Sequence, residues 1–142
     1  RLEFVGNFKN IFFYNDSKAT NIESSRNAIN SFKNIYWVLG GRQKSGGLKG
    51  IENSLKYVEH AFSFGESGNE FNEFLKKKGI ECTYSNKLES VFVTAVKKAL
   101  KEKKQINIIF SPACSSFDQY ENFEQRGNKF KALVSGIIKN AG

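Results

Sequence analysis

The sequence predicts an α/β domain of three layers, in which a mostly parallel sheet is covered by helices on both faces. Two observations lead to this fold class. Short apolar runs alternate along the chain with amphipathic helical patterns, and this alternation is typical of parallel strands joined by crossover helices. The apolar runs also have the length and composition of strands that are buried on both faces.

The predicted strands and helices alternate from residue 11 onward. Thr20 and Glu23 have the spacing of a capping box, which predicts that a first helix begins near Thr20. Gly79 follows a helical pattern, as a C-terminal cap does. We expect strands at residues 11–14, 35–39, 61–64, 81–84 and 106–110, and helices at residues 20–32, 51–57, 69–78, 88–100 and through residues 130–138.

Three polar loops follow predicted strands. Right-handed crossovers place every strand-to-helix loop at the same edge of a parallel sheet. The loops at residues 16–20, 42–45 and 114–123 should therefore converge on one crevice, which is where open α/β sheets bind their ligands.

The composition fits a single domain spanning residues 1–142. A chain of 142 residues can bury roughly 70% of its unfolded surface, and fourteen Phe residues supply much of the core. No apolar run approaches the ~20 residues that a membrane span needs. The chain lacks Met and begins with Arg1, so we expect a fragment of a longer protein, the alternative being a small protein that has lost its initiator Met.

The formal net charge of +8 indicates anionic partners such as nucleotides, carboxylates or nucleic acid. The alternative is a solvated lysine-rich surface, which suits most of the lysines because they lie on the polar sides of helical patterns. Cys82 and Cys114 have neither metal-binding nor redox spacing and are expected to be reduced thiols. His60, the single histidine, is expected to be structural.

The glycine-rich loop at residues 40–50 superficially resembles a phosphate-binding P-loop. A P-loop needs a glycine directly before its Lys-Ser pair, but Gln43 precedes Lys44 here. The loop therefore does not predict a triphosphate site. A lysine on a glycine-rich loop at a strand end offers a mobile cation for a carboxylate, although Lys44 could also be only a solvated side chain.

Two polar strings carry the strongest functional information: NDSKATN at residues 15–21 and SPACSSFDQYENFEQRG at residues 111–127. With the GG-x-x-K loop that ends at Lys44, they resemble the C-terminal domain of the Mur ligases. The first string resembles the branch of this family that adds D-glutamate. The resemblance covers nearly the whole chain, but it is loose between residues 46 and 100, and residues 42–43 and 46–47 depart from the expected pattern.

The resemblance implies a D-glutamate site made by Thr20, Lys44, Ser116 and the backbone N–H of Phe123. Near a helix N-terminus, the free N–H groups favour an anion. The ring of Phe123, seven residues before Phe130, is expected to pack in the core.

The resemblance also implies nucleotide contacts, by Asp16 at the ribose and by Lys18 near the phosphates. Arg1 and Glu3 resemble a segment that links the central and C-terminal domains of the family, and Arg1 is implied to contact the nucleotide as well. Asp16 could instead serve as a helix cap. We expect Cys114 to pack in the interior and Asp118, Glu124 and Arg126 to form a structural charge network.

The implied activity is that of a bacterial cytoplasmic ligase of peptidoglycan synthesis, which joins D-glutamate to UDP-N-acetylmuramoyl-L-alanine through an acyl phosphate. ATP and Mg²⁺ are expected to bind mainly to a central domain that is absent from this chain, as is an N-terminal domain. We therefore expect no catalytic residue or metal ligand here, an inactive isolated domain, a monomer, and no nucleic acid or membrane partner.

Two other functions remain open from the sequence. The chain could come from another ligase of the same superfamily, such as a folylpolyglutamate synthase, although the string at residues 15–21 disfavours this. It could also be a non-enzymatic module that binds nucleotide or nucleic acid, as its net charge of +8 suggests.

Overall fold

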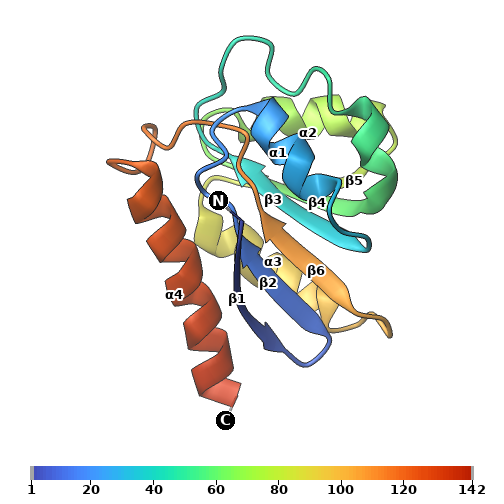
Figure 1. Ribbon diagram of the computed structural model, residues 1–142, viewed down its shortest axis with the longest axis vertical. Coiled ribbons are helices and arrows are strands. Elements are labelled where there is room, and N and C mark those ends of the chain that lie inside the picture. The colour runs from blue at the N-terminus through green and yellow to red at the C-terminus, as the bar shows by residue number, and fades with distance from the viewer. Residues whose placement is uncertain (1, 142) are drawn as a thin grey trace.

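The computed structural model describes residues 2–141. Its six-stranded sheet has the order β1-β2-β6-β3-β4-β5 (Figure 1). β1 is antiparallel to β2, and all other neighbouring strands are parallel, which confirms the mostly parallel sheet. The strands are β1 (Glu3–Phe8), β2 (Ile11–Asn15), β3 (Ile35–Gly40), β4 (Val58–Phe64), β5 (Glu81–Ser85) and β6 (Ile106–Phe110).

Helices cover both faces of the sheet, as the alternating pattern predicted. α3 (Leu88–Ala99) and α4 (Phe123–Ala141) pack on one face, and α1 (Ile22–Ile29), the 3₁₀ helix η1 (Glu52–Tyr57) and α2 (Gly68–Lys77) pack on the other. Figure 1 shows α4 running along the side of the sheet beside β1 and β2. The β3 and β6 strands are buried along their whole length because helices cover them from both sides.

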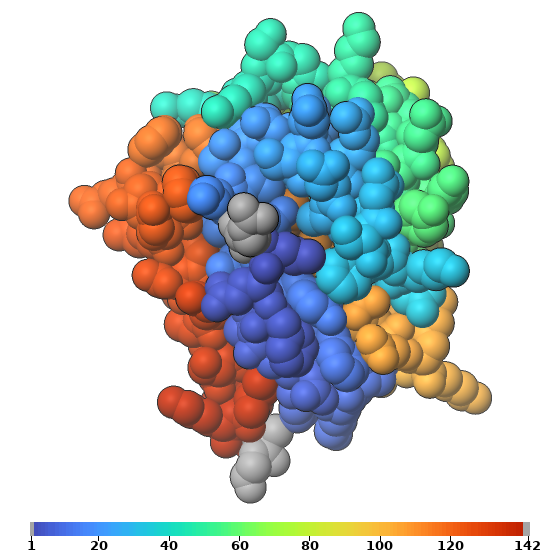
Figure 2. Space-filling model, viewed as in Figure 1, coloured from blue at the N-terminus to red at the C-terminus, as the bar shows by residue number. Residues whose placement is uncertain are grey.

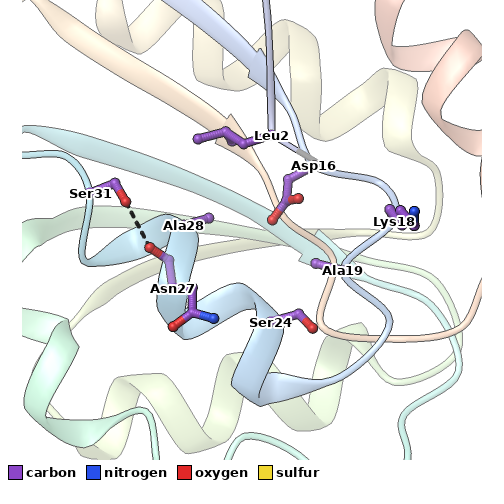
Figure 3. Close-up of a pocket in the computed structure, with 8 residues that line it drawn as sticks. All are labelled: Leu2, Asp16, Lys18, Ala19, Ser24, Asn27, Ala28 and Ser31. Atoms are coloured by element: carbon purple, nitrogen blue, oxygen red, sulfur yellow. Dashed lines mark hydrogen bonds between the residues drawn. The ribbon is translucent and has the colours of Figure 1, made fainter.

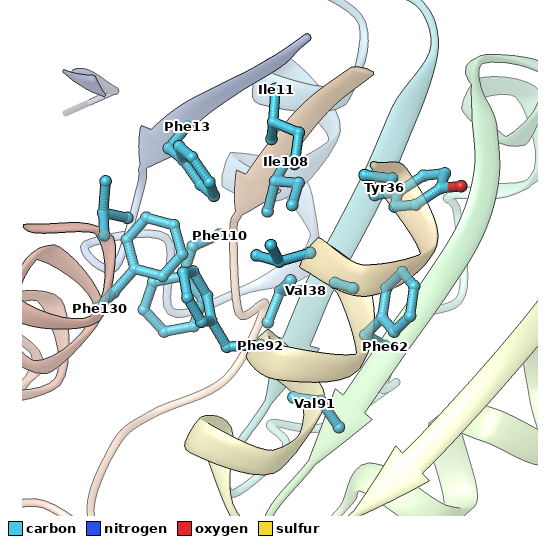
Figure 4. Close-up of a cluster of buried hydrophobic side chains, with 14 of the residues drawn as sticks. Ile11, Phe13, Tyr36, Val38, Phe62, Val91, Phe92, Ile108, Phe110 and Phe130 are labelled. Atoms are coloured by element: carbon cyan, nitrogen blue, oxygen red, sulfur yellow. The ribbon is translucent and has the colours of Figure 1, made fainter. Parts of the chain in front are cut away.

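Aromatic side chains dominate the core on the α3 and α4 face (Figure 4). The ring of Phe130 stacks on Phe110 with centroids 4.8 Å apart and meets Phe92 edge-on at 5.7 Å. Such pairs add to the free energy gained from burying the rings. Phe130 thereby joins α4 to β6 and α3, and so fixes where α4 begins at the sheet edge.

The first strand, β1, and the first helix, α1, differ from the sequence prediction. Residues 3–8 form β1, which was not predicted because an edge strand with polar and exposed positions has no continuous apolar pattern. Glu3 lies in β1, and its Oε1 is 3.5 Å from Nζ of Lys131. The capping box at Thr20 was wrong: Asn21 caps α1 by accepting a 2.9 Å hydrogen bond from the N–H of Ser24. α1 also ends at Ile29, short of residue 32.

His60 lies in the interior of β4, as expected for a structural residue, with 7% of its surface exposed. Its ring stacks on Phe62 with centroids 4.3 Å apart. Its Nε2 lies 2.9 Å from the Thr83 hydroxyl, and its Nδ1 lies 3.6 Å from the carboxylate of Glu81. Burial lowers the pKa of His60, Lys98 adds to this effect, and Glu81 opposes it.

We predict that acid destabilises the fold through His60. Because its pKa is lower in the folded state than in the unfolded state, the unfolded state binds more protons as pH falls from about 7.5 to 5. The wild-type protein should therefore lose unfolding free energy relative to His60→Gln over this range, as measured by urea denaturation. Parallel pH profiles for the two proteins would contradict this prediction.

Candidate functional site

The loops after β2, β3 and β6 meet at one edge of the sheet. Arg42 and Ser115 exchange two backbone hydrogen bonds of 3.1 and 3.0 Å. The N–H of Ala113 donates to the carbonyl of Ala19 over 3.0 Å. Figure 2 shows the segment after β6, in orange, against the segment after β2, in blue. The predicted meeting of the three loops is confirmed, but the predicted common crevice is not, because Lys44 lines a cavity separate from the one beside Asp16 and Lys18.

Asp16 directly follows β2 and lies in a network of buried hydroxyl groups. Its carboxylate accepts a 2.8 Å hydrogen bond from Ser111, whose hydroxyl also lies 2.8 Å from that of Ser25. Burial raises the pKa of Asp16, and the hydrogen bond from Ser111 opposes this rise. The network attaches the start of the 16–21 loop to β6 and α1.

A cavity of about 430 Å³ opens beside Asp16 and Lys18. Figure 3 shows the Asp16 side chain directed towards α1, with Ser24 and Asn27 on the opposite wall. Lys18 is exposed, whereas Asp16 has 8% of its surface exposed. Two of the three residues predicted to contact a nucleotide, Asp16 and Lys18, therefore share one cavity.

Side-chain contacts anchor the glycine-rich loop to residues at the start of α2, but Lys44 is exposed. The side chain of Gln43 donates to Glu70 over 2.9 Å, and its backbone N–H donates to the hydroxyl of Ser67. Arg42 forms an ion pair with Glu66 at 3.2 Å. Lys44 lines a second cavity of about 550 Å³, which lies between this loop and α2.

Ser116 lies on the segment that joins β6 to α4, and Phe123 is the first residue of α4. Ser116 is buried with 2% of its surface exposed, and it directly follows the residue that pairs with Arg42. Asn122 caps α4 by accepting a 2.8 Å hydrogen bond from the N–H of Gln125. The N–H of Phe123 therefore belongs to the first turn of a 19-residue helix, where backbone donors and the helix dipole favour an anion.

The expectation that the Phe123 ring packs in the core was wrong. The residue is half-buried and lines a cavity of about 200 Å³ with Ser17, Lys18 and Gly127. Seven helical residues rise about 10 Å, so Phe123 lies beyond the part of α4 that Phe130 holds on the sheet. The seven-residue spacing correctly placed Phe123 on the same side of α4 as Phe130. It could not show that Phe123 lies beyond the part of the helix that packs on the sheet.

The predicted charge network of Asp118, Glu124 and Arg126 is also replaced by other contacts. Arg126 is fully buried and donates to the hydroxyl of Ser17 over 2.9 Å and to its carbonyl over 2.6 Å. Asp118 accepts a 2.9 Å hydrogen bond from the backbone N–H of Glu66, and Glu124 is exposed. The sequence did not indicate a role for Ser17, although this residue lies within the polar string at residues 15–21.

Three loops in contact at one sheet edge thus carry Thr20, Lys44 and Ser116, and Phe123 begins the helix that follows the third loop. Arg1 lies outside the described residues. Cys82 lies in β5, Cys114 is buried as expected, and both thiols are free.

Between residues 2 and 141, no group of three or more His, Cys, Asp or Glu side chains could hold a metal ion. No helix in the same part of the chain has the length and apolar character to span a membrane.

Comparison with solved structures defines the class of fold. A domain assigned to a UDP-N-acetylmuramate:L-alanyl-gamma-D-glutamyl-diaminopimelate ligase of Haemophilus ducreyi matches 94% of this chain and 99% of its own, with a TM-score of 0.53 and 18% identity. A UDP-N-acetylmuramate–alanine ligase of Thermotoga maritima matches 89% of this chain and 27% of its own, with a TM-score of 0.52 and 16% identity. The chain therefore has the α/β fold of a Mur ligase C-terminal domain.

Curated sequences identify the particular relatives. UDP-N-acetylmuramoylalanine–D-glutamate ligases are 44% identical over 92% of this chain in Wolbachia sp. subsp. Brugia malayi, 43% over 99% in Wolbachia pipientis and 37% over its full length in Caulobacter vibrioides. The chain spans 26%, 27% and 30% of the lengths of these proteins. No protein-family model matches. The chain is homologous to the C-terminal portion of UDP-N-acetylmuramoylalanine–D-glutamate ligase.

We predict that Gly41→Ala disrupts the meeting of the loops. Gly41 has φ 130°, and a Cβ there would lie 2.3 Å from the carbonyl oxygen of Ser115, which pairs with Arg42. Gly46→Ala is a matched control, because Gly46 also has positive φ but its Cβ would meet nothing within 4 Å. The first variant should lose at least ~2 kcal/mol more unfolding free energy than the second. Equal losses in urea denaturation would show that the loops are not closely packed at Gly41.

Proposed function

We propose that this chain is the amino-acid-binding domain of a three-domain ligase that joins D-glutamate to UDP-N-acetylmuramoyl-L-alanine in the bacterial cytoplasm. The observation that carries the proposal is the meeting of the loops that bear Thr20, Lys44, Ser116 and Phe123. The D-glutamate ligases to which the chain is homologous supply the substrate class. The domain acts as part of a monomer, and its N-terminal and central partner domains lie outside this chain.

The four residues are suited to holding a dicarboxylate. The ammonium group of Lys44 supplies a charge-assisted hydrogen bond. The hydroxyl groups of Thr20 and Ser116 and the N–H of Phe123 supply neutral donors, the last with the favourable dipole of α4. Two carboxylates fixed at separate points leave the amine of D-glutamate in one orientation, which reduces the entropic part of the barrier.

The reaction proceeds in two steps. The terminal carboxylate of UDP-N-acetylmuramoyl-L-alanine attacks the γ-phosphorus of ATP, giving an acyl phosphate and ADP. The amine of D-glutamate then attacks the acyl carbon, loses a proton, and expels inorganic phosphate from the tetrahedral intermediate. Closure of the domains would exclude water, which competes with the amine for the acyl phosphate.

The nucleotide is shared with the rest of the ligase. In this domain Asp16 and Lys18 line the cavity that would face it, with Asp16 accepting a hydrogen bond from the ribose and Lys18 lying near the phosphates. Arg1 is assigned to the nucleotide by resemblance alone. Most contacts with ATP and all contacts with Mg²⁺ are assigned to the central domain, so that this domain orients the amino acid and contributes no catalytic residue.

The test is phosphate release by the full-length ligase with ATP, Mg²⁺ and UDP-N-acetylmuramoyl-L-alanine. We expect turnover with D-glutamate and none with L-glutamate. A folded enzyme that binds ATP but releases phosphate with neither amino acid would rule out D-glutamate as the substrate.

Lys44→Ala should raise the KM for D-glutamate far more than that for ATP. Loss of a charge-assisted hydrogen bond costs roughly 1.5–3 kcal/mol, which corresponds to a change on the order of ten- to a hundred-fold. Lys49→Ala is the matched control, because Lys49 is an exposed lysine of the same loop. The two KM values are measured in the full-length ligase, and an unchanged KM for D-glutamate in Lys44→Ala would refute the role of Lys44.

The isolated chain should be folded but catalytically inactive. Its sheet has a complete core on both faces, whereas the reacting groups are assigned to domains outside it. We expect cooperative thermal unfolding by circular dichroism and no phosphate release with all three substrates present. Phosphate release that depends on D-glutamate would mean that this domain contains the catalytic groups.

A further inference from the structure

Arg126 is a buried cation without a carboxylate partner. It is fully buried in the first turns of α4, and none of the ion pairs among residues 2–141 includes it. Nε and Nη2 donate to Ser17, but Nη1 has no acceptor within the described part of the protein. Burial lowers the pKa of Arg126 to about 10, so the guanidinium remains charged at neutral pH.

Two of the groups around Arg126 provide no compensating charge. Burial raises the pKa values of Cys114 and Tyr120 to about 12, so both side chains are neutral at pH 7. The carboxylate of Asp118 favours the charged guanidinium electrostatically, but among residues 2–141 it forms no ion pair with Arg126, and its Oδ2 accepts the N–H of Glu66. Because a buried charge without an ion-pair partner is costly in free energy, a negative group that binds nearby would be favoured.

Nη1 of Arg126 lies close to the point where the loops after β3 and β6 meet. A Cβ built on Gly41 would be 3.2 Å from Nη1 of Arg126, 3.0 Å from Cβ of Cys114 and 2.3 Å from the carbonyl oxygen of Ser115. Ser116 is the next residue in the chain. The guanidinium also lies one helical turn after Phe123, so it is close in the fold to both groups proposed to bind a carboxylate.

A second link connects Arg126 to the first turn of α4. The hydroxyl of Ser17 accepts from Nε of Arg126 and donates to the carbonyl of Phe123 over 2.8 Å. Gly127 permits this approach, because a Cβ there would lie 3.1 Å from Cβ of Ser17. The loop that carries Thr20 is thereby fastened to the helix that carries the Phe123 N–H.

We propose that Arg126 is a positioning residue whose missing counter-ion is the carboxylate of the bound amino acid. It does not touch the substrate. Its charge stabilises the carboxylate held by Ser116 and the N–H of Phe123, and its bonds to Ser17 keep the two loops aligned. This inference rests on the proposed function, because it takes D-glutamate as the anion.

The test separates charge from hydrogen bonding in the full-length ligase. Arg126→Met removes both, Arg126→Lys keeps the charge, and Ser17→Ala removes the contact with the Phe123 carbonyl while keeping the charge. Lys139→Met is the control: it removes a charge from an exposed position of α4, roughly 20 Å along the helix from Arg126. The KM values for D-glutamate, ATP and UDP-N-acetylmuramoyl-L-alanine are measured for each variant.

We expect Arg126→Met to raise the KM for D-glutamate about tenfold, as the loss of one nearby charge at intermediate dielectric would do, with the other two KM values unchanged. Arg126→Lys should restore most of the loss, and Ser17→Ala should have the smaller effect. A purely structural role would instead lower thermal stability without separating the three KM values.

Several outcomes would overturn the inference without affecting the proposed function. These are an unchanged KM for D-glutamate in folded Arg126→Met, equal losses in Arg126→Lys and Arg126→Met, or equal increases in all three KM values. Arg126→Gln removes the charge but keeps an amide donor for Ser17, and it decides the question if Arg126→Met does not fold. Absence of D-glutamate-dependent turnover in the wild-type ligase would refute the proposed function itself.

Discussion

The hydrogen bonds of Ser111 hold together the sheet edge on which the candidate site is built. Ser111 directly follows β6 and is fully buried. Its carbonyl accepts from the indole of Trp37 over 2.7 Å and from the hydroxyl of Ser25, and its N–H donates to β3. Its hydroxyl reaches Asp16. One residue thus connects β3, α1 and the end of β2, and every polar group involved is satisfied in a place where an unsatisfied one would be costly.

The rigidity of this edge decides which groups can move. Asp16, Ser116 and Phe123 are held by backbone pairing, by a buried hydroxyl network or by the start of a helix that aromatic stacking fixes on the sheet. The loop after Gln43 is different. It is exposed around Lys44, and Gly46 and Gly47 have φ values of 87° and 53°, which glycine adopts without strain. The proposed D-glutamate site therefore combines the fixed donors of Ser116 and Phe123 with the mobile ammonium group of Lys44.

The sequence predicted the buried elements better than the edges and the contacts between loops. β3 and β6 were predicted closely because their apolar runs match burial on both faces. β1 was missed because its burial pattern is irregular and a bulge interrupts it after Phe4. Thr20 and Asn21 both suit a helix cap, and only the backbone geometry decides between them.

The candidate site shows the same limit of prediction. Loop convergence followed from the chirality of crossovers, which is a general rule. The pairing of Arg126 with Ser17 joins residues 109 positions apart, and no local pattern specifies it. Local charge spacing instead suggested partners for Arg126 among the acidic residues near it in the sequence.

The two cations proposed to act on the carboxylates of D-glutamate, Lys44 and Arg126, have complementary properties. Lys44 is solvated before the amino acid arrives, so it must lose water and become ordered when it binds a carboxylate. Arg126 is already desolvated and fixed, and the cost of its burial is met when the chain folds. Binding an anion near Arg126 therefore gains electrostatic free energy without a further ordering cost. A fixed buried charge can select the position of one carboxylate, and a mobile exposed one can then close on the other.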